Sequence, residues 1–199
     1  IPLFEITSGS YRLPIILQYH ANGIKPLVDK PGVCGWGWEI NCGGVVTRTL
    51  RGGIPDEDIN IGYATHPIED YTDSITLAVE QHKRDGEVDI FTAIFNNKRL
   101  DFLIELTPDK QELKAVPLNK TNIRIENVPI GHIPSWKITD EDGIQYIFAE
   151  KEIMINIRIE EAVSDNNVKR DSCISSWYLT RIIIPNSPDI IFKYDSYDP

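Results

Sequence analysis

The sequence lacks long apolar runs and is short of positive charge. No apolar stretch approaches the ~20 residues that a bilayer-spanning helix needs, so we expect no membrane-spanning segment. Lys and Arg together number 20 against 30 Asp and Glu, which gives a formal net charge of -10. Nucleic acids and anionic membrane surfaces are bound by basic patches. The charge balance therefore excludes nucleic acid as an expected partner.

Cysteine and histidine are too few and too scattered for a disulfide framework or a metal centre. The three cysteines, Cys34, Cys42 and Cys173, are an odd number and show no Cys-x-x-Cys spacing. Cys34 and Cys42 could form a disulfide only if the glycine-rich segment between them makes a tight hairpin. Buried free thiols are the favoured state, because cysteine packs as a small apolar residue. No histidine has a partner at metal-ligand spacing, so we expect no metal and no cofactor.

Sequence signatures of catalysis are also missing. There is no Gly-x-Ser-x-Gly nucleophile elbow and no phosphate-binding glycine loop. Paired carboxylates are abundant, but most fall in predicted turns rather than across a cleft. Asp140-x-Asp142-Gly143 begins like a calcium loop, yet a strand pattern follows it at once, which favours a hairpin turn. We expect no catalytic residues, and calcium stabilisation through the acidic loops remains a minor hypothesis.

Short runs of β-branched and aromatic residues, separated by Pro, Gly, Asn and Asp, fill most of the chain. This pattern is typical of antiparallel strands and hairpins. Strands are predicted over residues 11–19, 45–50, 90–95, 99–106, 136–139, 145–148, 153–159, 176–184 and 190–194. The expected fold class is mainly β, with antiparallel sheets and hairpins arranged as a sandwich-like structure or as a partial barrel or shell.

One segment, from Tyr71 to His82, contains apolar residues without Pro or Gly. It predicts a short helix capped by Thr72 or Asp73, with a strand as the open alternative. At most one or two short helices are expected in the whole chain. Residues 1–199 are interpreted as a single β-rich module, and a weak subdivision near Gly131 is the alternative. The chain begins without Met and without a signal-peptide pattern, so we expect it to be a fragment of a longer protein.

The most unusual stretch runs from residue 32 to residue 52 and reads Gly-Val-Cys-Gly-Trp-Gly-Trp-Glu-Ile-Asn-Cys-Gly-Gly-Val-Val-Thr-Arg-Thr-Leu-Arg-Gly. Its glycines allow positive φ and close backbone approach, so two chain segments can cross there. Trp36 and Trp38 fall on one side of an extended chain and could cover a sheet edge or fill a corner. The alternative is that these two tryptophans form a stacking platform for sugar rings. The packing interpretation is the favoured one.

Two arginines close this stretch. Arg48 and Arg51 are expected to hydrogen-bond exposed carbonyls or to form ion pairs with the acidic residues that follow, because guanidinium groups bind carboxylates in a bidentate way. The acidic candidates are Asp56, Glu57 and Asp58.

The same stretch resembles the entry segment of secreted bacterial Rhs/YD-repeat proteins and of the related insecticidal toxin-complex subunits. The positions that match the family pattern are Gly35, Gly37, Trp38, Asn41, Gly43, Gly44, Arg48 and Gly52. Further stretches look like the family in the same order along the chain: residues 8–10, 13–15, 17–24, 89–91, 95–96, 176–182, 185–186 and 190–194. Departures from the pattern are Trp36, Glu39, Cys42 and the pair Ser187-Pro188.

The resemblance implies a non-catalytic structural module from the N-terminal part of such a protein, secreted or at the cell surface. In family members a β-rich shell encloses a C-terminal toxin, so the implied partner is the downstream sequence of the same polypeptide. The alternative function is a carbohydrate-binding domain, or less plausibly a glycoside-cleaving one, that uses Trp36 and Trp38 with acidic side chains. Cell-surface glycans or proteins would then be the partners.

Overall fold

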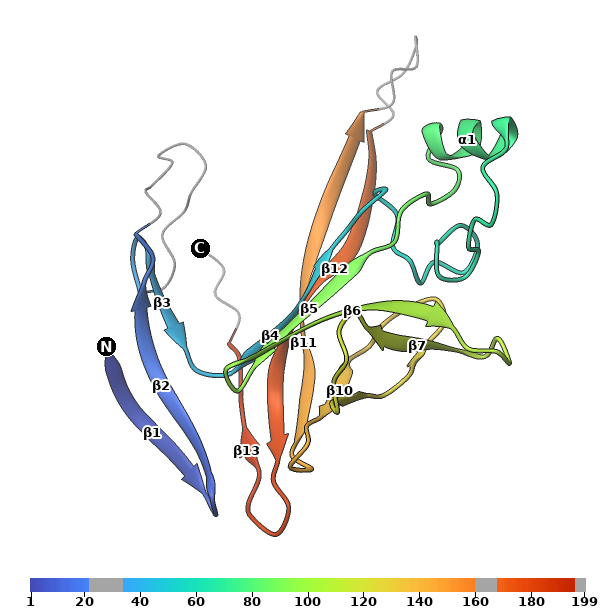
Figure 1. Cartoon of the computed structure of the whole chain (residues 1–199). Coiled ribbons are helices and arrows are strands. Elements are labelled where there is room, and N and C mark those ends of the chain that lie inside the picture. The colour runs from blue at the N-terminus through green and yellow to red at the C-terminus, as the bar shows by residue number, and fades with distance from the viewer. Residues whose placement is uncertain (22–33, 160–167, 196–199) are drawn as a thin grey trace.

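The computed structural model describes residues 1–21, 34–159 and 168–195, and gives the backbone alone for residues 156–159 and 168–171. The protein is mainly β, with antiparallel sheets and one helix in the described part of the chain (Figure 1). This confirms the fold class predicted from the sequence. The large sheet is curled into a half-barrel, so the partial-barrel form of that prediction is the correct one.

A small sheet of three strands in the order β1-β2-β3 begins the chain. Its strands are β1 (Pro2–Ser8), β2 (Tyr11–Tyr19) and β3 (Trp38–Asn41). The alternation predicted for residues 11–19 is confirmed, because Tyr11, Leu13 and Ile15 are buried. Pro14 pairs with β1 and lies outside the part of β2 that pairs with β3, so its missing N–H breaks no hydrogen bond to that strand.

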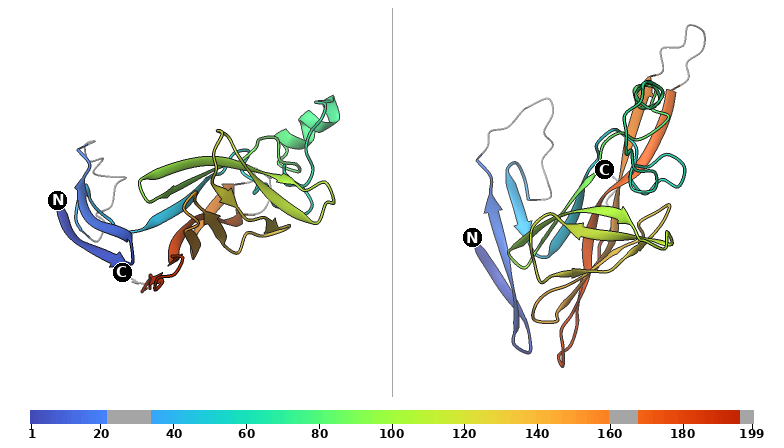
Figure 2. Two further views of the ribbon diagram at one scale, coloured as in Figure 1. Left: turned by 60° about the horizontal axis from the view of Figure 1, so that its bottom comes forward. Right: turned by 45° about the vertical axis from the view of Figure 1, so that its right-hand side comes forward.

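The large sheet has ten strands, and its main path runs in the order β8-β10-β11-β12-β4-β5-β6-β7-β9, with β13 paired to β12. The strands are β4 (Gly44–Thr49), β5 (Ile90–Phe95), β6 (Lys98–Leu106), β7 (Glu112–Pro117), β8 (Arg124–Ile125), β9 (Val128–Pro129), β10 (Trp136–Thr139), β11 (Gln145–Ile159), β12 (Val168–Ile183) and β13 (Ile190–Ile191). The two end strands, β8 and β9, are separated in the chain by Glu126 and Asn127 alone. The sheet must therefore curl until its ends come together (Figure 2).

Two of the hairpins form where their turn residues predict them. Asn96 and Asn97 join β5 to β6 with φ of 45° and 56°, the left-handed region that asparagine tolerates. Between β10 and β11, Asp140 Oδ1 accepts hydrogen bonds from the backbone N–H of Asp142 and of Ile144, each at 3.0 Å. The hairpin-turn interpretation of that acidic stretch is thus confirmed.

Strand boundaries are less accurate. The separate strands predicted at 145–148 and 153–159 are one continuous strand, β11, and β12 begins at Val168 rather than near residue 176. The charged run from Glu150 to Glu152 suggested a break, but β11 and β12 pair with each other through it. Backbone pairing with a long partner overrides the local pattern. The strand predicted over residues 190–194 is shorter in the structure, where β13 spans only Ile190–Ile191.

The segment between Tyr71 and His82 is a helix, α1 (Asp73–Glu80), so the helical alternative was the correct one. Thr72 caps it, because its Oγ1 accepts a hydrogen bond from the N–H of Ile75 at 3.4 Å. None of the helix residues is buried. The helix and the small sheet lie at opposite ends of the molecule (Figure 2).

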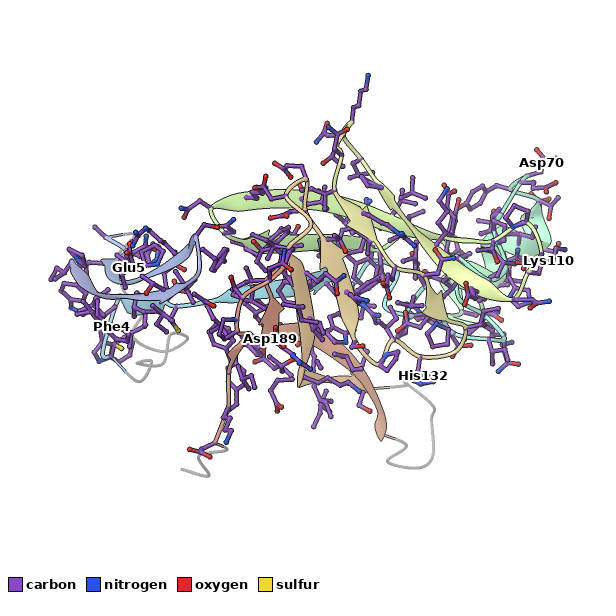
Figure 3. The ribbon with its side chains drawn as sticks, turned by 90° about the horizontal axis from the view of Figure 1, so that it is seen from below. Phe4, Glu5, Asp70, Lys110, His132 and Asp189 are labelled. Carbon is purple, nitrogen blue, oxygen red and sulfur yellow. The ribbon has the colours of Figure 1, made fainter. Side chains whose placement is uncertain are left out.

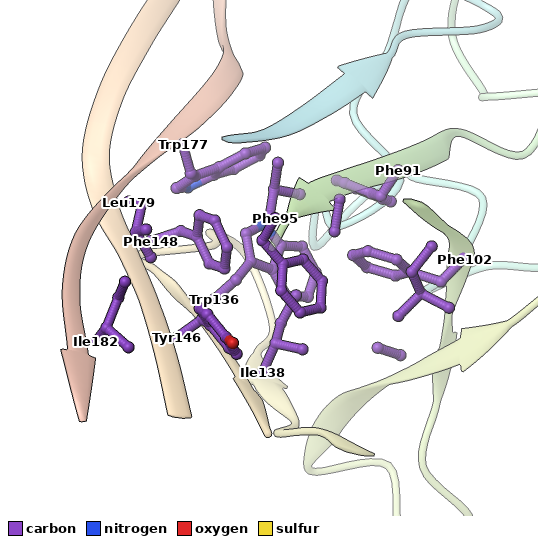
Figure 4. Close-up of a cluster of buried hydrophobic side chains, with 14 of the residues drawn as sticks. Phe91, Phe95, Phe102, Trp136, Ile138, Tyr146, Phe148, Trp177, Leu179 and Ile182 are labelled. Carbon is purple, nitrogen blue, oxygen red and sulfur yellow. The ribbon is translucent and has the colours of Figure 1, made fainter. Parts of the chain in front are cut away.

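An aromatic core fills the concave side of the curled sheet (Figure 4). Trp136 lies edge-on to Phe91, Phe102 and Trp177, with ring centroids 5.0–5.8 Å apart. Trp177 is fully buried and its indole N–H donates to the carbonyl of Ile133 at 3.1 Å. The other large members of the core are Phe95, Ile138, Tyr146, Phe148, Leu179 and Ile182.

The alternative of a weak subdivision near Gly131 would place a boundary between β9 and β10. Both of these strands belong to the large sheet.

Candidate functional site

The segment singled out by the sequence divides between the two sheets. Gly35, Trp36 and Gly37 form a turn before β3, whereas Gly43 to Gly52 run through β4 and beyond it. The turn is closed by a weak hydrogen bond from the N–H of Trp38 to the carbonyl of Gly35 at 3.4 Å. Trp36 and Trp38 therefore do not lie on one side of an extended chain, and that expectation was wrong. Residues 32 and 33, and the family match at 22–24, lie outside the described residues.

Trp36 and Trp38 lie at the surface of the small sheet, in contrast to the core residues Trp136 and Trp177. Trp36 is 41% exposed and Trp38 is half-buried. The Trp38 ring packs against Tyr19, which is its partner on β2, at a centroid distance of 5.0 Å. A Cβ at Gly37 would lie 2.9 Å from the Tyr19 ring, and Gly37 has a φ of +72°, so this turn requires glycine.

One face of the small sheet is continuously apolar. Cross-strand partners share a face, and the register places Leu17 opposite Ile40 and Tyr19 opposite Trp38 on the same side as Tyr11, Leu13 and Ile15. The end of this face near Ser8 and Tyr11 is covered by the turn that precedes β13, where Ser8 Oγ donates to the carbonyl of Pro188 at 2.5 Å. The other end of the face is exposed to solvent: the exposed fraction is 56% for Tyr19 and 40% for Ile40.

Gly43, Gly44 and Asn41 lie where the chain passes from the small sheet to the large one. A Cβ at Gly44 would lie 2.7 Å from the Ile94 carbonyl oxygen and 3.2 Å from the Phe148 ring. Gly43 has ordinary van der Waals space, since its nearest neighbour would be Phe192 at 3.4 Å. Asn41 is exposed and pairs with β2. The close approach expected of these glycines is thus found at Gly44.

Arg48 is the one residue of the segment whose charge is fully buried. Its guanidinium forms an ion pair with Glu57 at 2.5 Å, and its Nε lies 3.8 Å from Asp89. The group also lies over the rings of Phe91 and Trp177, with its Cζ at 5.1 and 5.4 Å from their centroids. The ion pair predicted between Arg48 and the acidic stretch is therefore confirmed for Glu57. Arg51 pairs instead with Glu87, at 3.4 Å and in solvent.

Two carboxyl groups, those of Glu57 and Asp89, contact this arginine directly, and together with Asp56 and Asp85 we call them the acid cluster. The three aspartates have no exposed surface. Asp56 and Asp89 are joined twice: the N–H of Asp89 donates to Asp56 Oδ2 at 3.0 Å, and the N–H of Asp56 donates to Asp89 Oδ2 at 3.4 Å. Besides burial and the charge of Asp89, hydrogen bonding with the Asp85 carboxyl raises the pKa of Asp56, so the carboxyl groups of Asp56 and Asp85 are neighbours.

Burial changes the protonation of this cluster. It raises the pKa of Asp56 to about 9, with repulsion from the Asp89 carboxylate as a further cause. It raises the pKa of Asp89 to about 7, opposed by the N–H of Arg51 and the charge of Arg48, and it also raises the pKa of Asp85. Four ionised carboxyls and one guanidinium would leave a net charge of -3 in the interior. At least one carboxyl must therefore hold a proton at neutral pH.

Gly52 is explained by the same cluster. Its φ is +62°, and a Cβ at this position would lie 2.2 Å from Asp85 Oδ1. The carboxyl group of Asp85 thus occupies the space that any other side chain at position 52 would need. Among the matched family positions, Gly52 and Arg48 both serve the acid cluster, while Gly35, Gly37, Trp38 and Asn41 belong to the small sheet.

Sequence reasoning missed Asp85 as a member of this cluster and gave Asp89 no acid–base role. A signal was present for Asp89, because it lies between Val88 and Ile90 at the start of an apolar strand, where an aspartate is buried at a cost unless it has partners. Asp85 carries no comparable signal. It reaches the cluster because β4 and β5 are neighbours, with Thr49 opposite Ile90.

The arrangement can hold protons and charge, and its neighbours indicate no reacting group. Cys173 on β12 contacts Arg48, and burial raises the pKa of its thiol, so it is not an activated thiolate. Within residues 1–21, 34–155 and 172–195, no group of three or more His, Cys, Asp or Glu side chains is arranged to hold a metal ion. No helix in the described chain is long and apolar enough to cross a bilayer.

The cysteines are free thiols among the described residues, and Cys34 is not bonded to Cys42. The expectation that all three would be buried was wrong, because Cys42 is exposed and the other two are half-buried. Comparison of the chain with protein-family models, with curated proteins and with solved structures finds no match.

Proposed function

We propose that this chain is a non-catalytic structural module of a secreted protein of the Rhs/YD-repeat type, which helps to build a β shell around a downstream effector. The observation that carries the proposal is a set of strand edges that have no neighbouring strand among the described residues and bear exposed apolar side chains. Soluble proteins usually shorten, charge or cover such edges, because they pair readily with other strands. The family resemblance of the segment from Gly35 to Gly52 supports the same function.

The first edge is β1. Within the described chain β1 has β2 as its only neighbour, and its Leu3 and Phe4 are 49% and 61% exposed. Phe4 and Glu5 lie at one end of the molecule, far from Asp70 and Lys110 at the other (Figure 3). The edge therefore extends away from the curled sheet, where a further strand has access to it.

The second edge is the ribbon, which we define as residues 150–159 of β11 with residues 168–175 of β12. These residues pair with each other, whereas β10 reaches only to Phe148 and β4 only to Ser176. Ile153 and Ile155 are 64% and 62% exposed on the ribbon, which projects beyond the rest of the sheet (Figure 1). An exposed apolar strand of this kind is stabilised by adding a neighbour.

The test compares this chain alone with a polypeptide that also contains the sequence following it in its gene. Backbone amides of β1 and of the ribbon should exchange with solvent at least tenfold more slowly in the longer protein, because a new strand would bond them. Combined Phe4→Lys and Ile155→Lys substitutions should abolish that protection. Leu77→Lys on α1, at a similarly exposed position, is the matched control and should not affect it. Equal exchange in both proteins would contradict the proposal.

Carbohydrate binding is the second candidate, and the exposed Tyr19–Trp38 pair favours it. Aromatic rings at the surface can stack on sugars, and Glu39 and His20, joined at 3.0 Å, lie beside the pair. A glycan array followed by fluorescence titration should then give saturable quenching that Trp38→Ala removes. Trp136 and Trp177 are buried and supply a constant background. A chain that binds no glycan on the array would eliminate this candidate.

A further inference from the structure

The acid cluster fastens the two ends of one long excursion from the large sheet. We call residues 50–89 the excursion: it leaves the sheet after β4, contains α1, and returns at β5, which is adjacent to β4. Since α1 buries none of its residues, the helix does little to fix the excursion. Its apolar anchors are Ile54, Ala64 and Ile68, each 5–8% exposed. The remaining anchorage comes from the buried aspartates.

Hydrogen bonds from these aspartates tie the start of the excursion to its end. Asp89 at the end accepts from the N–H of Arg51 at 2.8 Å and exchanges hydrogen bonds with Asp56. The N–H of Asp85 donates to the carbonyl of Ile61 at 2.9 Å, which adds the middle of the excursion. Loss of the contact between Asp56 and Asp85 would therefore loosen the start, the middle and the end of the excursion together.

Asp56 and Asp85 each have one buried carboxyl oxygen without a hydrogen-bond partner among the described residues. Asp56 Oδ1 and Asp85 Oδ2 are buried and receive no hydrogen bond from any N–H or hydroxyl group. Two carboxylates cannot satisfy each other, but a carboxylic acid can donate to a carboxylate. A single proton between Asp56 and Asp85 satisfies both oxygens. Without it, two like charges would be in contact in the protein interior.

The groups around the pair do not supply an alternative to that proton. From β4, Nη2 of Arg48 binds Glu57 and Nε lies 3.8 Å from Asp89, while Nε and Nη1 donate no hydrogen bond to either acid of the pair. From the excursion itself, Arg51 pairs with Glu87 in solvent, and Arg84 donates from Nη2 to the carbonyls of His66 and Pro67. Asp58 caps its own turn through Asn60 and Ile61, and Cys173 faces Arg48 from β12.

We propose that the excursion is a pH-sensitive latch, closed by one proton that Asp56 and Asp85 share and loosened when that proton is lost. A latch of this kind responds to pH where ordinary surface carboxylates do not. When it opens, Ile54, Ala64 and Ile68 lose their packing, and Arg48 loses the carboxyl groups that bury it. The latch does not depend on the shell function proposed above.

The direction of the response follows from linkage. The pKa of Asp56 is about 9 with the latch closed, whereas in an open, hydrated excursion it returns to about 3.8. Closure is then strongest in acid and weakens as pH rises between these two values, by up to tenfold in the open/closed ratio per pH unit. Above about 9 the dependence levels off, because both states have lost the proton. Asp89, with a pKa of about 7, steepens the response below that pH.

Hydrogen exchange of the whole chain between pH 5 and 9 tests the latch, with rates corrected for the intrinsic pH dependence of amide exchange. Protection of amides in the excursion should fall by roughly tenfold per pH unit relative to amides in β6. Asp56→Asn should remove this difference above pH 7, where Asp89 no longer contributes, because an amide can donate to Asp85 and still accept from the N–H of Asp89. Asp70→Asn, at an exposed acid of the same excursion, should retain the wild-type response.

Three results would overturn the proposal. In the wild type, protection of the excursion could change with pH in parallel with protection of β6. That result would show that no proton holds the excursion in place. A pH response unchanged by Asp56→Asn would place the titrating group elsewhere. A loss of protection on adding EDTA at constant pH, or a gain with calcium, would mean that a cation joins the two carboxylates. Should Asp56→Asn fail to fold, Asp85→Asn and the wild-type pH series carry the same test.

Discussion

Replacing Arg48 by methionine should be among the most destabilising single changes in this protein. The guanidinium is fully buried and, in the part of the chain that the structure describes, forms the one ion pair of Glu57, at 2.5 Å, within the acid cluster. Methionine has a similar length and can still pack on Phe91 and Trp177, so the change removes the charge with little loss of volume. What remains is an acid cluster with no buried positive charge.

The expected cost follows from the contacts. Removing one partner of a buried ion pair typically costs about 3–5 kcal/mol, because the remaining charge is left uncompensated. The loss of the two cation–π contacts adds roughly 1 kcal/mol. Protonation of Asp89 would recover part of this, so the expected loss at pH 7 is about 3–4 kcal/mol. At pH 5 the loss should be smaller, since protonation is then easier.

Urea unfolding, followed by the fluorescence of Trp136 and Trp177, measures this change. With a denaturant slope of about 2 kcal/mol per molar, the midpoint should fall by about 1.5–2 M. Arg51→Met is the matched control: the Arg51–Glu87 pair is about half exposed, and its loss should cost less than about 1 kcal/mol. Equal midpoints for the two variants would refute the view that Arg48 neutralises a buried cluster.

Two further predictions use matched pairs of positions. Gly52→Ala should cost about 2–3 kcal/mol more than Gly131→Ala in thermal or urea unfolding: both glycines have positive φ, but only at position 52 would the Cβ collide, 2.2 Å from Asp85 Oδ1. Similar losses for both would show that backbone strain alone matters. Asp140→Ala should cost about 2–4 kcal/mol, because the N–H groups of Asp142 and Ile144 and the hydroxyl of Tyr146 lose their acceptor. Glu141→Ala, whose salt bridge with Lys98 is at the surface, should lower the unfolding midpoint much less than Asp140→Ala, and a reversed order would refute this role of Asp140.

Features of the fold that depend on residues close to one another in the sequence could be predicted from the sequence alone. The Asn96–Asn97 hairpin and the Thr72 cap are local, since each is decided by a few side chains bonding to their own backbone. The strands β1, β3, β7, β8 and β9 were missed. β1 and β3 show little alternation, and β8 and β9 span two residues each, so only pairing with another strand makes them extended. β7 does alternate between exposed and buried residues.

The candidate site divides in the same way. The pairing of Arg48 with an acid nine residues later could be predicted, because short separations leave few partners. The contact of Asp56 with Asp89 spans 33 residues and depends on β4 and β5 being neighbours. Nothing in residues 56 and 85 taken separately indicates that their carboxyl groups meet. Long-range proximity of like charges is opposed by every local rule, so it is visible only in the folded chain.

The two proposals meet at one place in the fold. β4 carries Arg48 toward the acid cluster and pairs with β12 at Ser176 to Tyr178, directly where the ribbon begins. Cys173 belongs to the ribbon, and its thiol interacts with Arg48. The base of the ribbon therefore lies beside the acid cluster. Packed contacts of this kind are one physical route by which a change at one site reaches another. If the latch opens, Arg48 must either follow its carboxyl partners or remain beside Cys173 without them, and both alternatives disturb the strand pair that supports the exposed Ile153 and Ile155. The edge we propose for assembly should therefore be best ordered under the acidic conditions that close the latch.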